Sequence, residues 1–431
     1  MGGYGVVALA AGVVLYLAQL ADFGIEALGV REVAQDPRGI TDSAPSILTT
    51  RLLIAGCVIL IALPIAVLGL PQPEGTLIAV YTLTLLPIAA STKWIHLGLE
   101  SARPVGLART VGELVMVVLV VGLVRESGDI GSVPLAQFAG ESTLALVLLA
   151  LLIRRGYHLP VRWDWSRVRS VFRRARPLVF HALLGLVIFN SDLVFLRVFR
   201  DLASVGHYAA GYTVISFLLN LGVAYGTALL PTLTRLSART TAERSLYHVA
   251  QAHVFAAGLP IAFGGAVLAG PLMVTVFGMG YVPAAAALQI LIWSIPIALF
   301  RTVAIVALIA RNRHDQVLRT ITSATVMNLG LNLLLIPPIG IIGAAWATVA
   351  TELLRALLAL RFAAQEGLPL LPVRRMVPMA VSGVVMAGIL IVVRPSNLWV
   401  SVILGGISYV AVLSLMGGVR YTGGRLPTLR V

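Results

Sequence analysis

The sequence predicts an all-α membrane protein whose chain crosses the bilayer many times. The 431-residue chain is 58% hydrophobic and only 12% charged, with a mean hydropathy of +0.95. Soluble domains, in contrast, are about 45 to 50% apolar. The apolar residues also form long unbroken runs, whereas the strands of a membrane barrel alternate polar and apolar residues over about 10 positions. We therefore expect membrane-spanning helices and no strands.

An apolar run of about 17 to 25 residues is long enough to cross the bilayer as a helix, and the chain contains about thirteen such runs. The expected spans are residues 5–30, 51–70, 76–97, 105–124, 135–153, 178–199, 204–233, 247–277, 284–310, 318–336, 341–363, 375–393 and 398–417. Four prolines inside them each remove a backbone hydrogen bond and permit a kink: Pro64, Pro87, Pro260 and Pro296.

A strongly basic stretch, residues 154–177, divides the chain and contains eight arginines. Apolar side chains alternate with these arginines at spacings that give a helix one apolar and one cationic face: Trp163, Trp165, Val168 and Val171. Such a segment suits an anionic membrane surface. We expect a cytoplasmic amphipathic connector between two membrane-embedded halves. A nucleic-acid-binding patch is the weaker interpretation, because basic loops beside spans are common in membrane proteins.

Basic residues occupy every second loop between the expected spans, and this alternation supports the helix count. They are Arg31, Arg38, Arg103, Arg109, the connector, Arg235, Arg239, Arg244, Arg311, Arg313, Arg374, Arg375, Arg420, Arg425 and Arg430, and only Arg125, Arg200 and Arg394 interrupt the pattern. Positive loops mark the cytoplasmic side. The net charge of +14 therefore sets orientation, with the C-terminus in the cytoplasm and Met1 outside.

A shift of about 204 residues places spans of the first half near spans of the second, which predicts two repeated lobes running in the same membrane sense. We expect a five-helix N-lobe at 1–153, a six-helix C-lobe at 178–365, and a further helix pair with a basic tail at 366–431. The helix at 178–199 has no counterpart in the first half. A first helix is therefore expected to be missing, through a late start codon or a truncation.

No enzyme motif is present in the sequence. Lys93 is the only lysine and is followed by Trp94 without a glycine-rich loop before it, so it cannot belong to a nucleotide-binding P-loop. Cys57 stands alone, and no HExxH motif or Cys and His cluster suggests a metal. We expect no catalysis and no cofactor, while transport could be coupled to protons or sodium.

Several ionisable residues lie inside the expected spans, where a charge costs about 2.5 to 3.5 kcal/mol on insertion scales. Such residues usually face a bundle interior or an aqueous cavity, so we expect a cavity between the halves. The candidate substrate-binding cations are Arg301, Lys93, His96 and Arg355, and the candidate ion-coupling or cavity carboxylates are Asp22, Glu113, Asp192 and Glu352. Other polar residues in spans are Glu26, Glu141, His181, Asn190, Arg197, Asn220, His253, Asn328 and Asn332.

Some of these residues have a structural interpretation. Glu352 and Arg355 are three residues apart on one helix and can pair with each other. Residues near span ends can form interhelical pairs or lie at the lipid interface: Glu26, Lys93, His96 and Arg197. Four deeper residues have no evident local partner and are the stronger functional candidates: Arg301, Asp22, Glu113 and Asp192.

Four stretches in order resemble the oligosaccharide (polysaccharide) flippase branch of the multidrug/oligosaccharidyl-lipid/polysaccharide (MOP) exporter superfamily. Residues 2–34, with the step Asp22-Phe23-Gly24, resemble the second helix of that family. Residues 190–214 are similar to the seventh helix and its turn into the eighth. Residues 270–291 and 328–348 are similar to the ninth-to-tenth and eleventh-to-twelfth junctions.

The resemblance implies a fourteen-helix, two-lobed transporter that moves polyprenyl-diphosphate-linked sugars to the outer leaflet without nucleotide hydrolysis. Arg301 would then bind phosphate, because a guanidinium donates two parallel hydrogen bonds to phosphate oxygens. The implied partners are this substrate, membrane lipids, a polysaccharide polymerase and glycosyltransferases, and not nucleic acid. The alternatives are a drug or cation antiporter of the sister branch, a lipid II flippase, and an inactive truncated transporter or scaffold.

Overall fold

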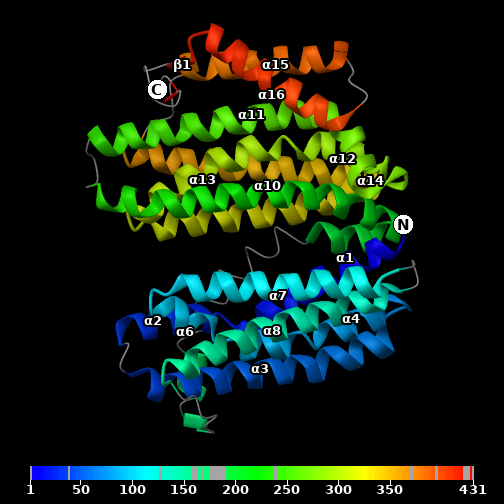
Figure 1. Cartoon of the computed structure of the whole chain (residues 1–431), viewed down its shortest axis with the longest axis vertical. Helices are drawn as coiled ribbons and strands as arrows, with labels where there is room; N and C mark the ends of the chain where they lie inside the picture. Colours follow the sequence, from blue (N-terminus) through cyan, green and yellow to red (C-terminus); the bar gives the residue numbers. More distant parts are fainter. Residues whose placement is uncertain are drawn as a thin grey trace. The chain divides into compact units, whose positions relative to one another are not determined.

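The computed structural model describes residues 2–36, 39–125, 129–157, 164–166, 168–173, 191–236, 241–368, 373–393, 397–420 and 428–429. It divides into two compact units, Gly2–Val194 and Phe195–Val431, called here the N-terminal and the C-terminal unit (Figure 1). The described residues contain eleven helices that are long and apolar enough to cross a membrane. The protein is thus all-α through its spans, as predicted.

The N-terminal unit is a helical bundle. Its elements are α1 (Gly2–Asp22), α2 (Ile25–Gln35), α3 (Ile40–Gly69), α4 (Glu74–Thr82), α5 (Leu85–Ala90), α6 (Lys93–Gly98), α7 (Ala102–Leu123), the 3₁₀ turn η2 (Asp129–Gly131) and α8 (Ser132–Arg154). Helix α1 packs against α3 and α4, and α7 packs along α8. A Cβ added at Gly112 of α7 would lie 2.7 Å from the Gly140 oxygen of α8. These two glycines therefore let the two helix backbones touch.

The first expected span, 5–30, is not one helix. It breaks between α1 and α2, where Phe23 and Gly24 have positive φ angles of 51° and 69°. The Asp22 carboxylate accepts a hydrogen bond from the backbone N–H of Glu26 at 3.3 Å, which satisfies one amide at the start of α2. The Asp22-Phe23-Gly24 step therefore forms a capped break inside the span.

The expected start of the second span at residue 51 is also wrong. Helix α3 begins at Ile40 and, with 30 residues, is about 45 Å long at 1.5 Å per residue. Arg51 therefore lies within the helix, with only 2% of its side chain exposed. The expected start was placed where the apolar run begins. The helix itself starts eleven residues earlier, in polar sequence.

The same helix break occurs once in each unit. A proline, Pro87 in α5 and Pro296 in α13, stands four residues after the break and has no N–H to donate to the carbonyl there. That carbonyl accepts a tighter 3₁₀ hydrogen bond instead, from Leu86 N to Leu83 O and from Ile295 N to Ile292 O, both at 3.1 Å. Pro87 and Pro296, two of the four prolines that sequence analysis assigned to kinks, thus stand at similar helix breaks, whereas Pro64 and Pro260 lie within the continuous helices α3 and α11. The expected repeat stays a prediction.

The C-terminal unit contains the remaining spans. After helical residues 195–199 come α10 (Leu202–Arg235), α11 (Thr241–Phe277), the 3₁₀ turn η3 (Met279–Tyr281), α12 (Ala284–Leu291), α13 (Ser294–Ala310), α14 (His314–Gln365), α15 (Val373–Val393) and α16 (Leu398–Leu415). Helices α15 and α16 pack against α11 (Figure 1). The tail contains a strand pair, β1 (Val419–Arg420) and β2 (Thr428–Leu429), so the expectation of no strands fails outside the spans.

Helix α14 holds two of the expected spans, 318–336 and 341–363, joined by a tight turn. The turn follows two prolines and is centred on Gly340, whose φ of 57° and ψ of −130° are not helical. Arg200 covers this turn and donates hydrogen bonds to the carbonyls of Ile336, at 3.4 Å, and Pro337. Arg200 was one of the arginines that did not fit the pattern of basic residues in every second loop. Its position is explained by these hydrogen bonds, because the broken helix leaves the carbonyls without N–H partners.

The expected number of about thirteen spans stays a prediction. Eleven candidate spans are found among the described residues, and α14 counts as one of them although its turn at Gly340 divides it. The expected span 178–199 lies largely outside the described residues, of which only 191–199 are helical there.

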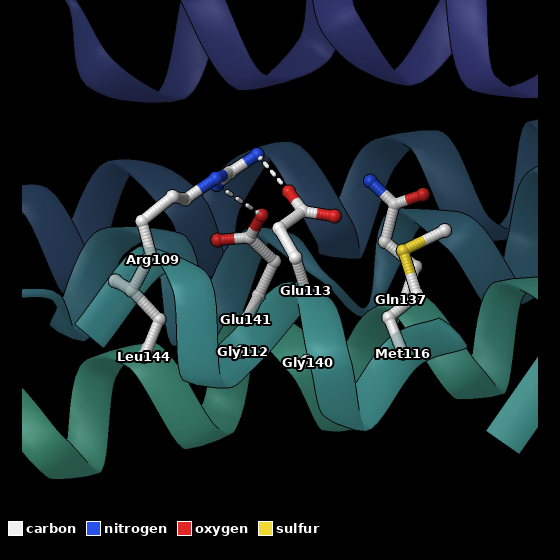
Figure 2. A pocket seen from close by; sticks show the side chains of 8 residues that line it. All are labelled: Arg109, Gly112, Glu113, Met116, Gln137, Gly140, Glu141 and Leu144. Carbon is white, nitrogen blue, oxygen red and sulfur yellow. Dashed lines mark hydrogen bonds and ion pairs between the residues drawn. The ribbon is translucent and has the colours of Figure 1, made fainter. Parts of the chain in front are cut away.

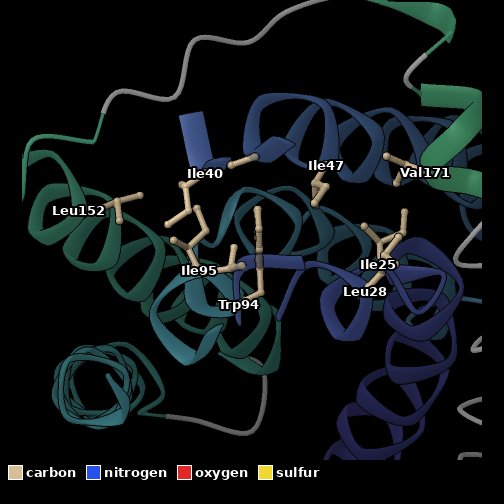
Figure 3. Packing of buried hydrophobic residues seen from close by; sticks show 10 residues of the cluster. Ile25, Leu28, Ile40, Ile47, Trp94, Ile95, Leu152 and Val171 are labelled. Carbon is tan, nitrogen blue, oxygen red and sulfur yellow. The ribbon is translucent and has the colours of Figure 1, made fainter. Parts of the chain in front are cut away.

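A buried apolar cluster holds the connector against the N-terminal unit (Figure 3). Val171 of the connector is 1% exposed and lies in one cluster with Ile25 and Leu28 of α2 and Ile47 of α3. Trp94 of α6 fills the space above Gly29, where an added Cβ would lie 2.5 Å from the indole ring. Within the described part of the connector, Val171 thus belongs to the core of the bundle. Trp163 lies outside the described residues.

Gly340→Ala should destabilise the protein, because a side chain in this backbone region costs about 1 to 3 kcal/mol. Gly330→Ala is the matched control on the same helix, since no atom lies within 4 Å of its added Cβ and alanine favours a helix. Thermal unfolding in detergent should show a lower melting temperature for Gly340→Ala alone. Equal melting temperatures for both variants would contradict the strained turn.

Candidate functional site

Two arginines share one glutamate inside the C-terminal unit. Arg301 Nε of α13 lies 2.9 Å from Glu352 Oε2 of α14, and Arg355 Nη1 contacts Glu352 Oε1. The three side chains are only 13%, 8% and 9% exposed, in the order Arg301, Glu352, Arg355. Two positive charges and one negative charge leave this Arg301 cluster with a net charge of +1. Such a charge is costly within a membrane unless an anion or water reaches it.

The Arg301 cluster also retains hydrogen-bond donors. A guanidinium carries five N–H donors, and among the described residues Arg301 and Arg355 each donate one hydrogen bond to Glu352. A polar strip lies beside the cluster on α14, where Asn332 Nδ2 donates to Asn328 Oδ1 at 3.1 Å. Arg301, which had no evident partner in its own helix, thus has one 51 residues away in the sequence.

A second ion cluster lies in the N-terminal unit around Arg51, which sequence analysis did not single out. Arg51 Nη2 lies 3.3 Å from Asp22 Oδ1 and 3.8 Å from Glu26 Oε2, and Lys93 Nζ lies 2.7 Å from Glu26 Oε1. Arg51 also donates to the carbonyls of Ile88 and Ser91 at 3.2 Å each. Two positive and two negative charges leave this Arg51 cluster neutral.

Arg51 was missed because it stands at the edge of an apolar run, where an arginine normally marks the membrane interface. A usable signal was present nevertheless. Asp22 and Glu26 are only four residues apart in the sequence, and two neighbouring carboxylates within an apolar span need a cation. The longer α3 supplies this cation, and Asp22 therefore does have a partner.

The other N-terminal candidates make interhelical contacts. His96 is fully buried, and its Nε2 lies 3.0 Å from the Leu148 carbonyl oxygen of α8, which joins α6 to α8. Lys93 pairs with Glu26, as its alternative interpretation allowed. Asp192 is buried in helical residues 191–199. His181 and Asn190 lie outside the described residues.

Glu113 is neither enclosed nor without a partner. Figure 2 shows that Arg109 reaches Glu113 on its own helix, at 2.7 Å, and Glu141 of α8, at 2.9 Å. The side chains of Arg109 and Glu113 are 56% and 48% exposed. One positive and two negative charges leave this α7–α8 cluster with a net charge of −1. It is thus a half-exposed acidic face within the span Ala102–Leu123.

Arg311, which was counted only as an orientation charge, is buried in an ion network. It makes two hydrogen bonds of 2.8 Å to the Glu243 carboxylate at the start of α11 and also contacts Glu366 just after α14. Arg313 bonds to the same Glu366 at 2.8 Å. This network fastens three helix ends together and is structural in character.

Solved structures of membrane transporters share this fold. The structure titled lipid II flippase MurJ, inward closed conformation, has a TM-score of 0.79 at 12% identity and covers 96% of this chain and 92% of that chain. An inward-facing multidrug resistance MATE transporter of the MOP superfamily gives 0.66 at 13%, covering 84% and 92%. A mutant of the Vibrio cholerae MATE transporter VcmN gives 0.53 at 18%, covering 85% and 88%. The chain therefore has the MOP-type fold.

The chain belongs to the polysaccharide biosynthesis protein family, which matches residues 2–237. No curated protein matches the chain. The protein is therefore a multi-pass membrane protein of the polysaccharide biosynthesis protein family, and its fold is of the MOP type. This confirms the family that the sequence resembles.

Arg51→Gln should destabilise the N-terminal unit, because removing one partner of a buried ion pair costs about 3 to 5 kcal/mol. The remaining Asp22 charge causes most of this loss, so adding Asp22→Asn should restore part of it. Thermal unfolding of the single and double variants in detergent measures both effects. A double variant that is less stable than Arg51→Gln would show that Asp22 acts independently of Arg51.

Proposed function

We propose that this protein moves a polyprenyl-diphosphate-linked oligosaccharide from the cytoplasmic to the external leaflet for surface polysaccharide synthesis. In this proposal the two lobes, N-terminal and C-terminal, alternate access to the two sides of the membrane, without nucleotide hydrolysis. The observation that carries the proposal is the Arg301 cluster, a buried group of net charge +1 within a transporter of the polysaccharide biosynthesis family.

The diphosphate is the part of such a substrate that this cluster can recognise. Arginine remains charged in a partly dry site and offers phosphate a planar fork of donors. The spare donors of Arg301 and Arg355 allow a phosphate oxygen to bind while Glu352 holds both guanidinium groups in place. Glu352 acts in this scheme as a counter-ion that limits the cost of the empty site.

The net charge of the Arg301 cluster weighs against a drug or cation antiporter, because a cation entering this site meets a positive charge. A lipid II flippase would use the same diphosphate chemistry and differ in the sugar. We infer that the basic loops are cytoplasmic, by the positive-inside rule. A polymerase and glycosyltransferases would then meet the substrate on opposite sides of the membrane.

We also propose that the α7–α8 cluster couples transport to protons or sodium. Its two carboxylates share one arginine, so one negative charge remains for a cation. Glu113 is exposed enough to exchange an ion, whereas Asp22 is held by Arg51 and Glu352 by two arginines. Lys93 and His96 were expected to bind substrate. We propose instead that they stabilise the N-terminal unit through their contacts between helices.

Arg301→Ala should reduce polysaccharide export about a hundredfold in a flippase-null host, as expected when one charge-assisted contact of about 3 kcal/mol is lost. Arg301→Lys keeps the charge and loses the fork, so it should rescue only part of the export. Surface polysaccharide is measured at equal membrane levels of each variant.

Arg103→Ala is the matched control, because Arg103 is an exposed arginine at the start of α7. Unchanged export by Arg301→Ala would remove the Arg301 cluster from the mechanism. Drug resistance conferred on an efflux-deficient host, without polysaccharide export, would favour the antiporter. Rescue of a host lacking its lipid II flippase would identify that substrate instead.

Glu113→Gln with Glu141→Gln should abolish the response of transport to an imposed ion gradient, because neither amide can take up a proton or carry a charge. Proteoliposomes holding a lipid-linked oligosaccharide are tested with a proton gradient and, separately, a sodium gradient. Glu100→Gln, in the turn before α7, is the control. Gradient-driven transport that persists in the double variant would exclude this cluster from coupling.

A further inference from the structure

The described part of the connector is a short amphipathic helix with sharply separated faces. Val168 and Val171 are buried, at 8% and 1% exposure. Trp165, Arg169 and Arg173 are exposed and follow one another at intervals of four residues, so they form a single stripe on the helix. Buried and exposed positions are thus on opposite sides, as an interfacial helix requires.

The buried side attaches this helix to the N-terminal unit at the break between α1 and α2. Phe172, at the edge of the buried side, is 41% exposed, and its ring stacks on Phe23 with 4.1 Å between ring centroids; Phe23 is one of the two break residues. Val171 packs with Ile25 and Leu28 in the first turns of α2. These contacts hold the helix against the N-terminal unit.

The two arginines of the exposed stripe stand apart from the ion clusters described above. Among the described residues, no ion pair involves Arg169 or Arg173. Trp165 remains 64% exposed although a tryptophan is costly to leave in water. Arg154 and Arg155, at the end of α8, are also exposed. Uncompensated positive charge beside an exposed indole is the composition of a membrane-interface contact.

We propose that Trp165, Arg169 and Arg173 form a docking face for the headgroups of anionic phospholipids. The two guanidinium groups bind lipid phosphates, and the indole lies at the headgroup level beside them. Anionic lipids are the occupant because both arginines carry charge of one sign and the stripe begins eleven residues after the end of a membrane-spanning helix, α8. Bound headgroups thereby hold the connector, and with it Phe172, against the α1–α2 break.

The test is lipid selectivity of the full chain in nanodiscs of equal phosphatidylglycerol and phosphatidylcholine, read by native mass spectrometry of retained lipids. The wild type should retain phosphatidylglycerol preferentially. Arg169→Gln with Arg173→Gln should weaken its binding about thirtyfold, at about fivefold per arginine. Trp165→Ala should weaken retention of both lipids, because the indole does not read headgroup charge.

Arg374→Gln with Arg375→Gln is the matched control, because it removes two exposed arginines at the start of α15. Retention of phosphatidylglycerol should fall far less in this control. The melting temperature in detergent checks that each variant folds. An equal fall in both double variants, or no preference in the wild type, would overturn the proposal. So would stronger binding of a single-stranded oligonucleotide than of phosphatidylglycerol vesicles by the same three residues.

Discussion

The pairing of charge inside the membrane is the constraint on which the rest of this structure depends. An unpaired arginine or carboxylate at depth is costly, and the lipid offers no hydrogen bond in exchange. Arg51 solves this for α1 by meeting Asp22 while it also binds carbonyls at the end of α5. Arg301 solves it for α13 by meeting Glu352 of α14. Each arginine therefore fixes helices that lie far apart in the sequence.

The Arg51 cluster and the Arg301 cluster differ in their balance of charge, and this difference is the basis for the separate roles that we propose for them. The neutral Arg51 cluster closes on itself beside a helix break and needs no further partner. The Arg301 cluster retains one positive charge, which only an additional anion or water can compensate. Under the function proposed above for this member of the polysaccharide biosynthesis protein family, that residual charge would bind the diphosphate of the substrate.

The sequence predicted the helical membrane fold and its family because long apolar runs and alternating loop charge are read directly from residue order. It could not predict where helices break or begin, since Phe23 adopts a positive φ and α3 starts in polar sequence. The candidate Arg301 and its neighbour Glu352 were both found, yet their contact spans 51 residues. Arg51 was missed because only the folded chain shows which carboxylate faces it.

The turn at Gly340 and its arginine imply an order of events during synthesis. The turn at Gly340 in α14 has to enter the bilayer with carbonyls that accept no helical N–H. Unsatisfied carbonyls are energetically costly in the hydrocarbon of the bilayer. Arg200 precedes this turn by 137 residues and therefore leaves the ribosome well before it. The donor for those carbonyls is already in the chain when the hairpin arrives, so the hairpin can complete its hydrogen bonding as it inserts.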